Sequence, residues 1–258
     1  MRQAFAATAL LLITRRCSAG CSASAFSKAW QPAAAAATFG RRSTPYSRDG
    51  VAFITEFLPA ADFTKVRDDC RSLRGGMKLE KDSIAIGRMG RYVDSRSAAH
   101  KLLTSSPVVE RVSRLVGNEV EPSEYPIELR SYRAGSGMDW HQDDQLYEDA
   151  QCELVLCLDN DSDSRTEWID AKGDQHSEWT PPNSALLVRA GDTGAAHRVI
   201  PLKTGERTIL KMVWTVPGSA KLDSFYEHID SLPGLRGKGL KQASAGGNRK
   251  GAKGRRQK

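Results

Sequence analysis

The stretch that most constrains this chain is Leu129–Tyr147, whose centre reads His141-Gln-Asp143. Its apolar-rich composition predicts a β-strand near 139–143, and residues i and i+2 of a strand point to the same face of a sheet. The imidazole of His141 and the carboxylate of Asp143 should therefore converge on one point. This pair would supply two protein ligands to a metal ion.

A third ligand is expected from His197, which precedes Arg207 by ten residues. Two imidazoles and one carboxylate on one side of an ion leave the opposite coordination positions open. This arrangement suits Fe(II) that must also bind a co-substrate and oxygen. The remaining histidines, His100, His176 and His228, show no partner pattern and are assigned no role.

The charge of the chain is unevenly distributed. Residues 1–48 carry seven basic residues and no acid, and residues 235–258 carry nine basic residues and no acid. All 31 acids lie between Asp49 and Asp230, where only 22 basic residues accompany them, so this part has a net charge of −9 although the whole chain has +7. The high pI of the chain therefore belongs to its two ends.

Residues 1–48 have the composition of a targeting presequence that is cleaved or disordered. One interpretation takes Ala4–Ile13 as a signal-peptide core and Ala23–Ala25 as a cleavage site before Phe26, which resembles the bipartite presequences of secondary plastids. The other interpretation is a mitochondrial transit peptide, which the interrupting Arg15–Arg16 pair favours. Both interpretations predict an organellar location, in a plastid or a mitochondrion. The remaining alternative is a disordered N-terminus without a targeting signal.

Three cysteines lie outside the presequence: Cys70, Cys152 and Cys157. An odd and sparse set of this kind does not indicate a disulfide framework. Cys152 and Cys157 lie in an apolar run and are expected to be buried thiols. No segment after the presequence contains the ~20 consecutive apolar residues of a membrane span, so none is expected in the mature chain.

Residues 49–230 are long enough for one domain with a substantial core. Up to residue 124, the spacing of the apolar residues and the positions of Gly and Pro indicate strands in some segments and helices in others. From Tyr125 onward, short strands separated by Gly, Asp and Pro clusters favour a sandwich or a barrel with a core at about 125–216. The strands are expected near 49–58, 83–89, 126–133, 139–143, 152–158, 166–170, 185–190, 195–200 and 207–215, the helices at 60–74, 97–103 and 107–116, and a long polar loop at 171–184.

The C-terminal residues 231–258 are rich in Gly, Ala and basic residues, which predicts a disordered tail. Such a tail could contact nucleic acid through counterion release, or it could act only as a solubilising segment. It contains no aromatic residue, so no sequence-specific recognition is expected from it.

Ten residues form an ordered motif: Tyr132, Gly135, His141, Asp143, His197, Val199, Pro201, Gly205, Arg207 and Trp214. This motif resembles that of the Fe(II)/2-oxoglutarate-dependent dioxygenases, and within that superfamily it is most similar to the prolyl 4-hydroxylase branch. The resemblance covers about 125–216, and the helical lead-in from residue 50 also fits that branch. Its specificity comes from the order and spacing of the whole set.

The resemblance implies a mainly β fold with flanking helices, a double-stranded β-helix or jelly roll. It implies that His141, Asp143 and His197 bind Fe(II), and that Arg207 pairs with the distal carboxylate of the co-substrate 2-oxoglutarate. A guanidinium suits this role because it is planar, charged and able to bind a carboxylate bidentately. Tyr132 would donate its hydroxyl to the same molecule if Tyr132 and Arg207 occupy neighbouring inward positions. O2 is the second co-substrate, and ascorbate is a further candidate cofactor.

The implied activity is hydroxylation of an unactivated C–H bond with release of succinate and CO2. A protein side chain is the expected substrate, with proline as the leading candidate. Met138 departs from the branch, which often has an aromatic residue there, and residues 212–225 lack the arginine expected of nucleic-acid demethylases. The alternatives are a small-molecule hydroxylase and a non-catalytic jelly-roll binding module whose basic tail contacts nucleic acid.

Overall fold

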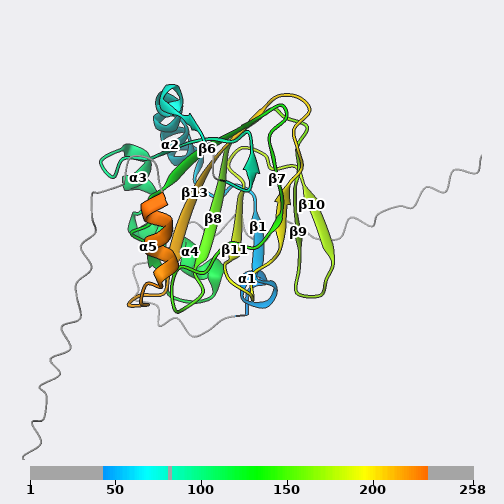
Figure 1. Cartoon of the computed structure of the whole chain (residues 1–258). Coiled ribbons are helices and arrows are strands. Elements are labelled where there is room, and N and C mark those ends of the chain that lie inside the picture. Colours follow the sequence, from blue (N-terminus) through cyan, green and yellow to red (C-terminus); the bar gives the residue numbers. More distant parts are fainter. Residues whose placement is uncertain (1–42, 81–82, 232–258) are drawn as a thin grey trace, which may run out of the picture. The chain divides into compact units, whose positions relative to one another are not determined.

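The computed structural model describes residues 43–80 and 83–231, and these form two antiparallel β-sheets with helices on one side (Figure 1). The larger sheet has the strand order β1-β11-β8-β13-β6-β4-β2, with β5 paired to β13, and the smaller sheet has the order β10-β9-β12-β7-β3. The strands are β1 (Val51–Ile54), β2 (Lys78–Leu79), β3 (Ala85–Ile86), β4 (Met89–Tyr92), β5 (Glu121–Pro122), β6 (Glu128–Arg133), β7 (Gly137–His141), β8 (Cys152–Asn160), β9 (Thr166–Ile169), β10 (Gln175–Glu178), β11 (Ala185–Arg189), β12 (His197–Val199) and β13 (Glu206–Thr215).

Helices cover the outer face of the larger sheet. Phe63 and Val66 of α2 and Val112 of α4 pack in the same buried cluster as Leu210 and Trp214 of β13. The helices are α1 (Pro45–Asp49), α2 (Ala60–Leu73), the 3-10 helix η2 (Arg74–Gly76), α3 (Ala98–Leu103), α4 (Ser106–Val116) and α5 (Asp223–Ser231). Burying these apolar faces against each other is the main favourable contribution to the stability of this layer.

The inner face of the larger sheet faces the smaller sheet. Because side chains alternate along a strand, Leu210 of β13 faces the helices, whereas Arg207 and Ile209 face inward. Ile209 packs there with Tyr132 of β6 and with Val199 of β12, which belongs to the smaller sheet. The space between the two sheets is therefore lined from both sides, and it contains the functional candidates.

The mainly β fold with flanking helices and the jelly-roll architecture are confirmed. The expected strand at 83–89 is wrong in detail, because Gly87 has φ +65 and separates β3 from β4, which belong to different sheets. The expected polar loop at 171–184 contains β10, which pairs with β9. Its polar sequence hid a strand that is mostly exposed and lies at the edge of the smaller sheet.

Helices α1 and α5 were not expected from the sequence. Tyr46 of α1 is buried in the main core and Phe225 of α5 is fully buried, so the folded domain begins upstream of residue 49. The presequence assignment for residues 1–42 and the basic tail from residue 232 lie outside the described residues. Within the described ranges, none of the helices combines the length and apolar character needed to cross a membrane.

Candidate metal centre and co-substrate cavity

Three expected ligands converge between the two sheets. His141 at the end of β7 lies directly opposite His197 at the start of β12, and the centres of their rings are 4.1 Å apart. Nε2 of His141 is 3.9 Å from Oδ1 of Asp143, and Nε2 of His197 is 3.5 Å from its Oδ2. One ligand atom from each residue lies within 4.8 Å of the others, so the three side chains can reach one ion.

Asp143 reaches this point by a route that the sequence did not predict. Strand β7 ends at His141, and Asp143 lies in the coil that follows, so the expected strand over 139–143 is wrong at its end. The backbone carbonyl of Asp143 accepts a hydrogen bond of 2.8 Å from the amide of Gly191. This contact, rather than strand alternation, directs the backbone of Asp143 toward the two histidines.

Both histidines present Nε2 to the centre. Nδ1 of His141 lies 2.9 Å from the carbonyl oxygen of Asp139, and Nδ1 of His197 lies 3.1 Å from that of Ala195. A carbonyl can only accept, so each Nδ1 carries the proton and each Nε2 keeps a free lone pair. Backbone contacts of this kind fix the orientation of metal-binding histidines.

The protonation states also suit a cation. Burial, followed by the nearby ring of His197, lowers the pKa of His141 to about 4. Burial opposes ionisation of Asp143, but Lys211 and the two histidines together hold its pKa below the ordinary value. His141 is thus neutral and Asp143 is a carboxylate at neutral pH. A set of two imidazoles and one carboxylate fits Fe(II).

A β-bulge shapes the strand that carries His141. His197 pairs with His141, and Val199 pairs with Met138. The two pairs are three residues apart on β7 but only two residues apart on β12, so β7 contains one extra residue. This extra residue lets both Met138 and His141 line the same cavity. Trp140, between Met138 and His141 on this strand, is 37% exposed and lies under the guanidinium of Arg198 at 4.8 Å.

A cavity of about 140 Å³ extends from the three ligands between the sheets. Arg207 and Tyr132 are directly opposite each other on β13 and β6, which confirms that they occupy neighbouring inward positions. Arg207 is 2% exposed and donates a hydrogen bond of 2.7 Å from Nη1 to Oγ1 of Thr166. Its buried Nε has no hydrogen-bond partner, and within the described part of the chain no carboxylate forms an ion pair with it. A buried, unpaired guanidinium fits a carboxylate supplied by a ligand.

Arg88 was missed by the sequence analysis. It is 4% exposed, lines the same cavity and donates from Nη1 to the hydroxyl oxygen of Tyr132 at 3.2 Å. Its Nε donates to Oε2 of Glu80 at 2.8 Å. No local signal marks Arg88, because its position depends on pairings of β3 with β7 and of β4 with β6.

Lys211 was also missed, although a signal existed. It follows Arg207 by four residues on β13, and so lies on the same inward face. Its Nζ donates to Oδ1 of Asp143 at 3.0 Å and forms an ion pair with Glu153 of β8. Burial alone would lower the pKa of Lys211, but the carboxylates of Asp143 and Glu153 raise it above the ordinary value.

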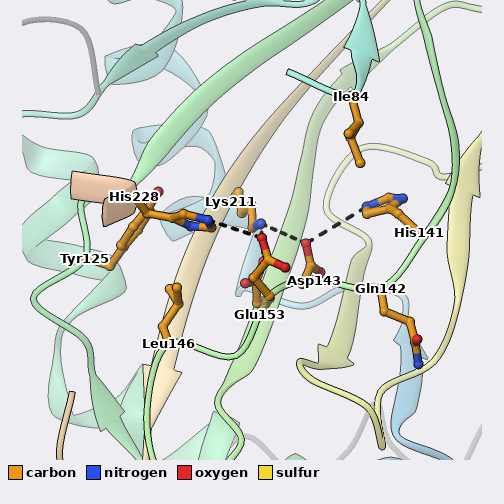
Figure 2. A pocket seen from close by; sticks show the side chains of 10 residues that line it. Ile84, Tyr125, His141, Gln142, Asp143, Leu146, Glu153, Lys211 and His228 are labelled. Carbon is orange, nitrogen blue, oxygen red and sulfur yellow. Dashed lines mark hydrogen bonds and ion pairs between the residues drawn. The ribbon is translucent and has the colours of Figure 1, made fainter. Parts of the chain in front are cut away.

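A second cavity, of about 160 Å³, adjoins the first at Asp143, and Figure 2 shows the residues that line it. It shares Ile84, His141, Asp143 and Lys211 with the first cavity. Five of the six residues that line only this cavity have polar side chains. One of them is His228 of α5, which was assigned no role from the sequence. The residues that line only this cavity are Tyr125, Gln142, Asp144, Leu146, Glu153 and His228.

Comparisons with known proteins match the fold but not the sequence. No model of a protein family matches the chain, and no curated protein matches it. Three solved structures are similar: a prolyl-4-hydroxylase from Pseudomonas putida (17% identity, 67% of this chain and 96% of that chain covered, TM-score 0.53), the non-haem alpha-ketoglutarate-dependent epimerase SnoN (12%, 74% and 87%, 0.60), and a prolyl hydroxylase from Trichoplax adhaerens in complex with a peptide fragment of hypoxia-inducible factor (16%, 66% and 84%, 0.55).

The architecture of this chain is therefore the one found in 2-oxoglutarate-dependent, non-haem iron enzymes, including prolyl hydroxylases. This agrees with the resemblance that the motif indicated. At these identities the similarity establishes the fold, and the chemistry must be argued from the side chains of this chain.

Proposed function

We propose that the protein is an Fe(II)- and 2-oxoglutarate-dependent dioxygenase that hydroxylates an unactivated C–H bond. One observation carries the proposal: the convergent set His141, Asp143 and His197 adjoins a cavity that contains the buried, unpaired guanidinium of Arg207. When bound, iron with 2-oxoglutarate and O2 would supply the oxidising chemistry, with succinate and CO2 as co-products.

The protein residues orient the co-substrate and exclude water. Arg207 and the hydroxyl of Tyr132 would hold the distal carboxylate of 2-oxoglutarate, while His141, Asp143 and His197 hold the metal at the other end of the cavity. Apolar side chains from four strands line the space between these two ends: Val155, Leu186, Val199 and Ile209. A dry wall of this kind strengthens the ionic contacts and limits side reactions with water.

We further propose a protein side chain as the substrate, with proline as the first candidate. This is supported by the fold shared with two prolyl hydroxylases, one of which was solved with a peptide fragment. A small-molecule substrate is the second candidate. It is favoured by the polar lining of the second cavity, and the similar epimerase was solved with Fe3+, alpha-ketoglutarate and nogalamycin RO. Ascorbate as a reductant, nucleic-acid contact through the tail and an organellar location stay predictions.

The rival hypothesis is a binding module that keeps the fold without turnover. Such a module has no need of two histidines whose tautomers are fixed by backbone carbonyls, nor of a buried arginine that has no carboxylate partner among the described residues. Retaining a buried, unpaired charge is costly to stability. The complete site therefore favours the enzyme.

The test is conversion of 2-oxoglutarate to succinate by the full chain loaded anaerobically with Fe(II) and then exposed to O2. Wild type is expected to form succinate even without a primary substrate, and Asp143→Ala is expected to lose this activity. Asp149→Ala, an exposed aspartate six residues away, is the matched control and should retain it. If wild type neither forms succinate nor binds 2-oxoglutarate, the enzyme proposal is wrong and the binding-module hypothesis takes its place.

A further inference from the structure

Lys211 lines both cavities, and Figure 2 shows it beside Asp143 and Glu153 in the second one. Its ammonium lies between the carboxylate of Asp143, to whose Oδ1 it donates at 3.0 Å, and the carboxyl group of Glu153 on the neighbouring strand β8. The Lys211 side chain is 16% exposed and that of Glu153 is 3% exposed. A half-buried lysine held on two sides has little freedom to move, so it can fix the position of the groups that it contacts.

The Asp143 carboxylate depends on this contact. Asp143 lies in coil, and the hydrogen bond from Gly191 fixes its backbone rather than its side chain. Among the described residues, the hydrogen-bond donor to its carboxylate is Lys211. Each oxygen of Asp143 faces one histidine, Oδ1 at 3.9 Å from Nε2 of His141 and Oδ2 at 3.5 Å from Nε2 of His197. The two oxygens still differ, because Lys211 donates to Oδ1, whereas none of the described residues donates a hydrogen bond to Oδ2.

The number of oxygens that Asp143 gives to the metal matters for the proposed reaction. With one oxygen and two histidines bound, a six-coordinate ion keeps about three open positions. A chelating 2-oxoglutarate and one O2 together need all of them. A carboxylate that bound through both oxygens would remove one of these positions.

We propose that Lys211 is a positioning residue that occupies Oδ1 of Asp143 and so restricts the carboxylate to one-oxygen coordination through Oδ2. Glu153 contacts the ammonium of Lys211 from the opposite side and so helps to fix its position. The inference rests on the metal site of the proposed function but adds a residue that the ligand motif does not contain. It predicts that loss of Lys211 changes the coordination of the metal as well as its affinity.

The experiment loads the full chain with Mn(II) and measures both the dissociation constant and the water-proton relaxivity per bound ion, which reports the number of water ligands. Lys211→Met removes the donor and keeps much of the side-chain length. We expect Mn(II) binding to weaken by roughly 10- to 100-fold, as for other residues that orient metal ligands. We also expect relaxivity per bound Mn(II) to fall by about one third, because Asp143 takes a second position. Lys211→Arg should restore the relaxivity.

Two further variants separate positioning from folding. The double variant Lys211→Met/Glu153→Gln removes both partners of the buried pair, so it avoids leaving Glu153 unpaired and should fold if the single variant does not. Lys65→Met changes a lysine whose side chain is 66% exposed on α2 and should change neither quantity. If the folded Lys211 variants bind Mn(II) with wild-type relaxivity, the inference is wrong. If wild type itself binds no Mn(II), the metal site of the proposed function fails first.

Discussion

Arg207 and Tyr132 lie directly opposite each other on the adjacent strands β13 and β6, and both side chains are buried in the cavity beside the three metal-ligand candidates. This cross-strand pair places a guanidinium and a phenolic hydroxyl at neighbouring positions in the lining of the cavity. A carboxylate bound there would receive a charge-assisted hydrogen bond from Arg207 and a neutral one from Tyr132.

We predict that Arg207→Met weakens binding of 2-oxoglutarate to the Mn(II)-loaded protein by roughly 10- to 100-fold, since a hydrogen bond to a charged group contributes about 1.5–3 kcal/mol. Isothermal titration of 2-oxoglutarate measures this without requiring turnover. Arg133→Met, on an exposed arginine next to Tyr132, is the control and should bind like wild type. Equal affinities for Arg207→Met and wild type would place the carboxylate elsewhere.

Arg88 is predicted to act on the co-substrate through Tyr132. Because the hydroxyl oxygen of Tyr132 accepts from Arg88 at 3.2 Å, its own proton is free to point at another acceptor, such as the carboxylate. Arg88→Met and Tyr132→Phe should each weaken 2-oxoglutarate binding, and the double variant should lose less than the sum of the two. A coupling energy of about 0.5–1.5 kcal/mol is expected from a double-mutant cycle. Strictly additive losses would show that the two residues act independently.

The sequence predicted most of the sheet framework because strand patterns are local. The motif also indicated the three candidate ligands, but the path of the backbone at Asp143 involves a contact with the distant Gly191. The apolar run that became β8 and the alternation of β13 identify strands directly, and β13 then fixes the inward position of Arg207. The same alternation could have identified Lys211, because a residue four positions after Arg207 on the same strand points to the same face.

Other features could not be predicted because they depend on contacts between distant segments. The bulge that turns both Met138 and His141 inward appears only when β7 pairs with β12. Arg88 reaches Tyr132 only after the segment on either side of Gly87 joins two different sheets. His228 comes to the second cavity on α5, a short helix close to the uniformly basic tail.

Acid should destabilise the metal-free protein through His141. Its pKa is lowered from 6.5 to about 4 in the folded state, so the unfolded chain binds the proton more readily and stability is lost as pH falls from 6.5 toward 4. The shift corresponds to at most about 3 kcal/mol. Urea unfolding in the presence of a chelator, at pH 7 and pH 4, should show this loss in wild type and a smaller loss in His141→Ala. The same pH dependence in both proteins would show that other groups cause it.

Gly137 is predicted to be needed for the alignment of β7. A Cβ at this position would lie 2.8 Å from Cγ and 2.9 Å from Cα of Pro201, so Gly137→Ala must push the start of β7 away from the chain after β12. Overpacking of this kind costs about 1–3 kcal/mol of unfolding free energy. The displacement should also reach His141 through the bulge and weaken Mn(II) binding.

The matched control for Gly137 is Gly75→Ala, where a Cβ would meet no atom within 4 Å. It should leave both the unfolding free energy and Mn(II) affinity close to wild type. Chemical denaturation and Mn(II) titration of the two variants measure the two effects separately. If Gly137→Ala is destabilised but binds Mn(II) like wild type, the bulge insulates His141 from the strand start, and the alignment of the metal site must then come from the pairing of His141 with His197 alone.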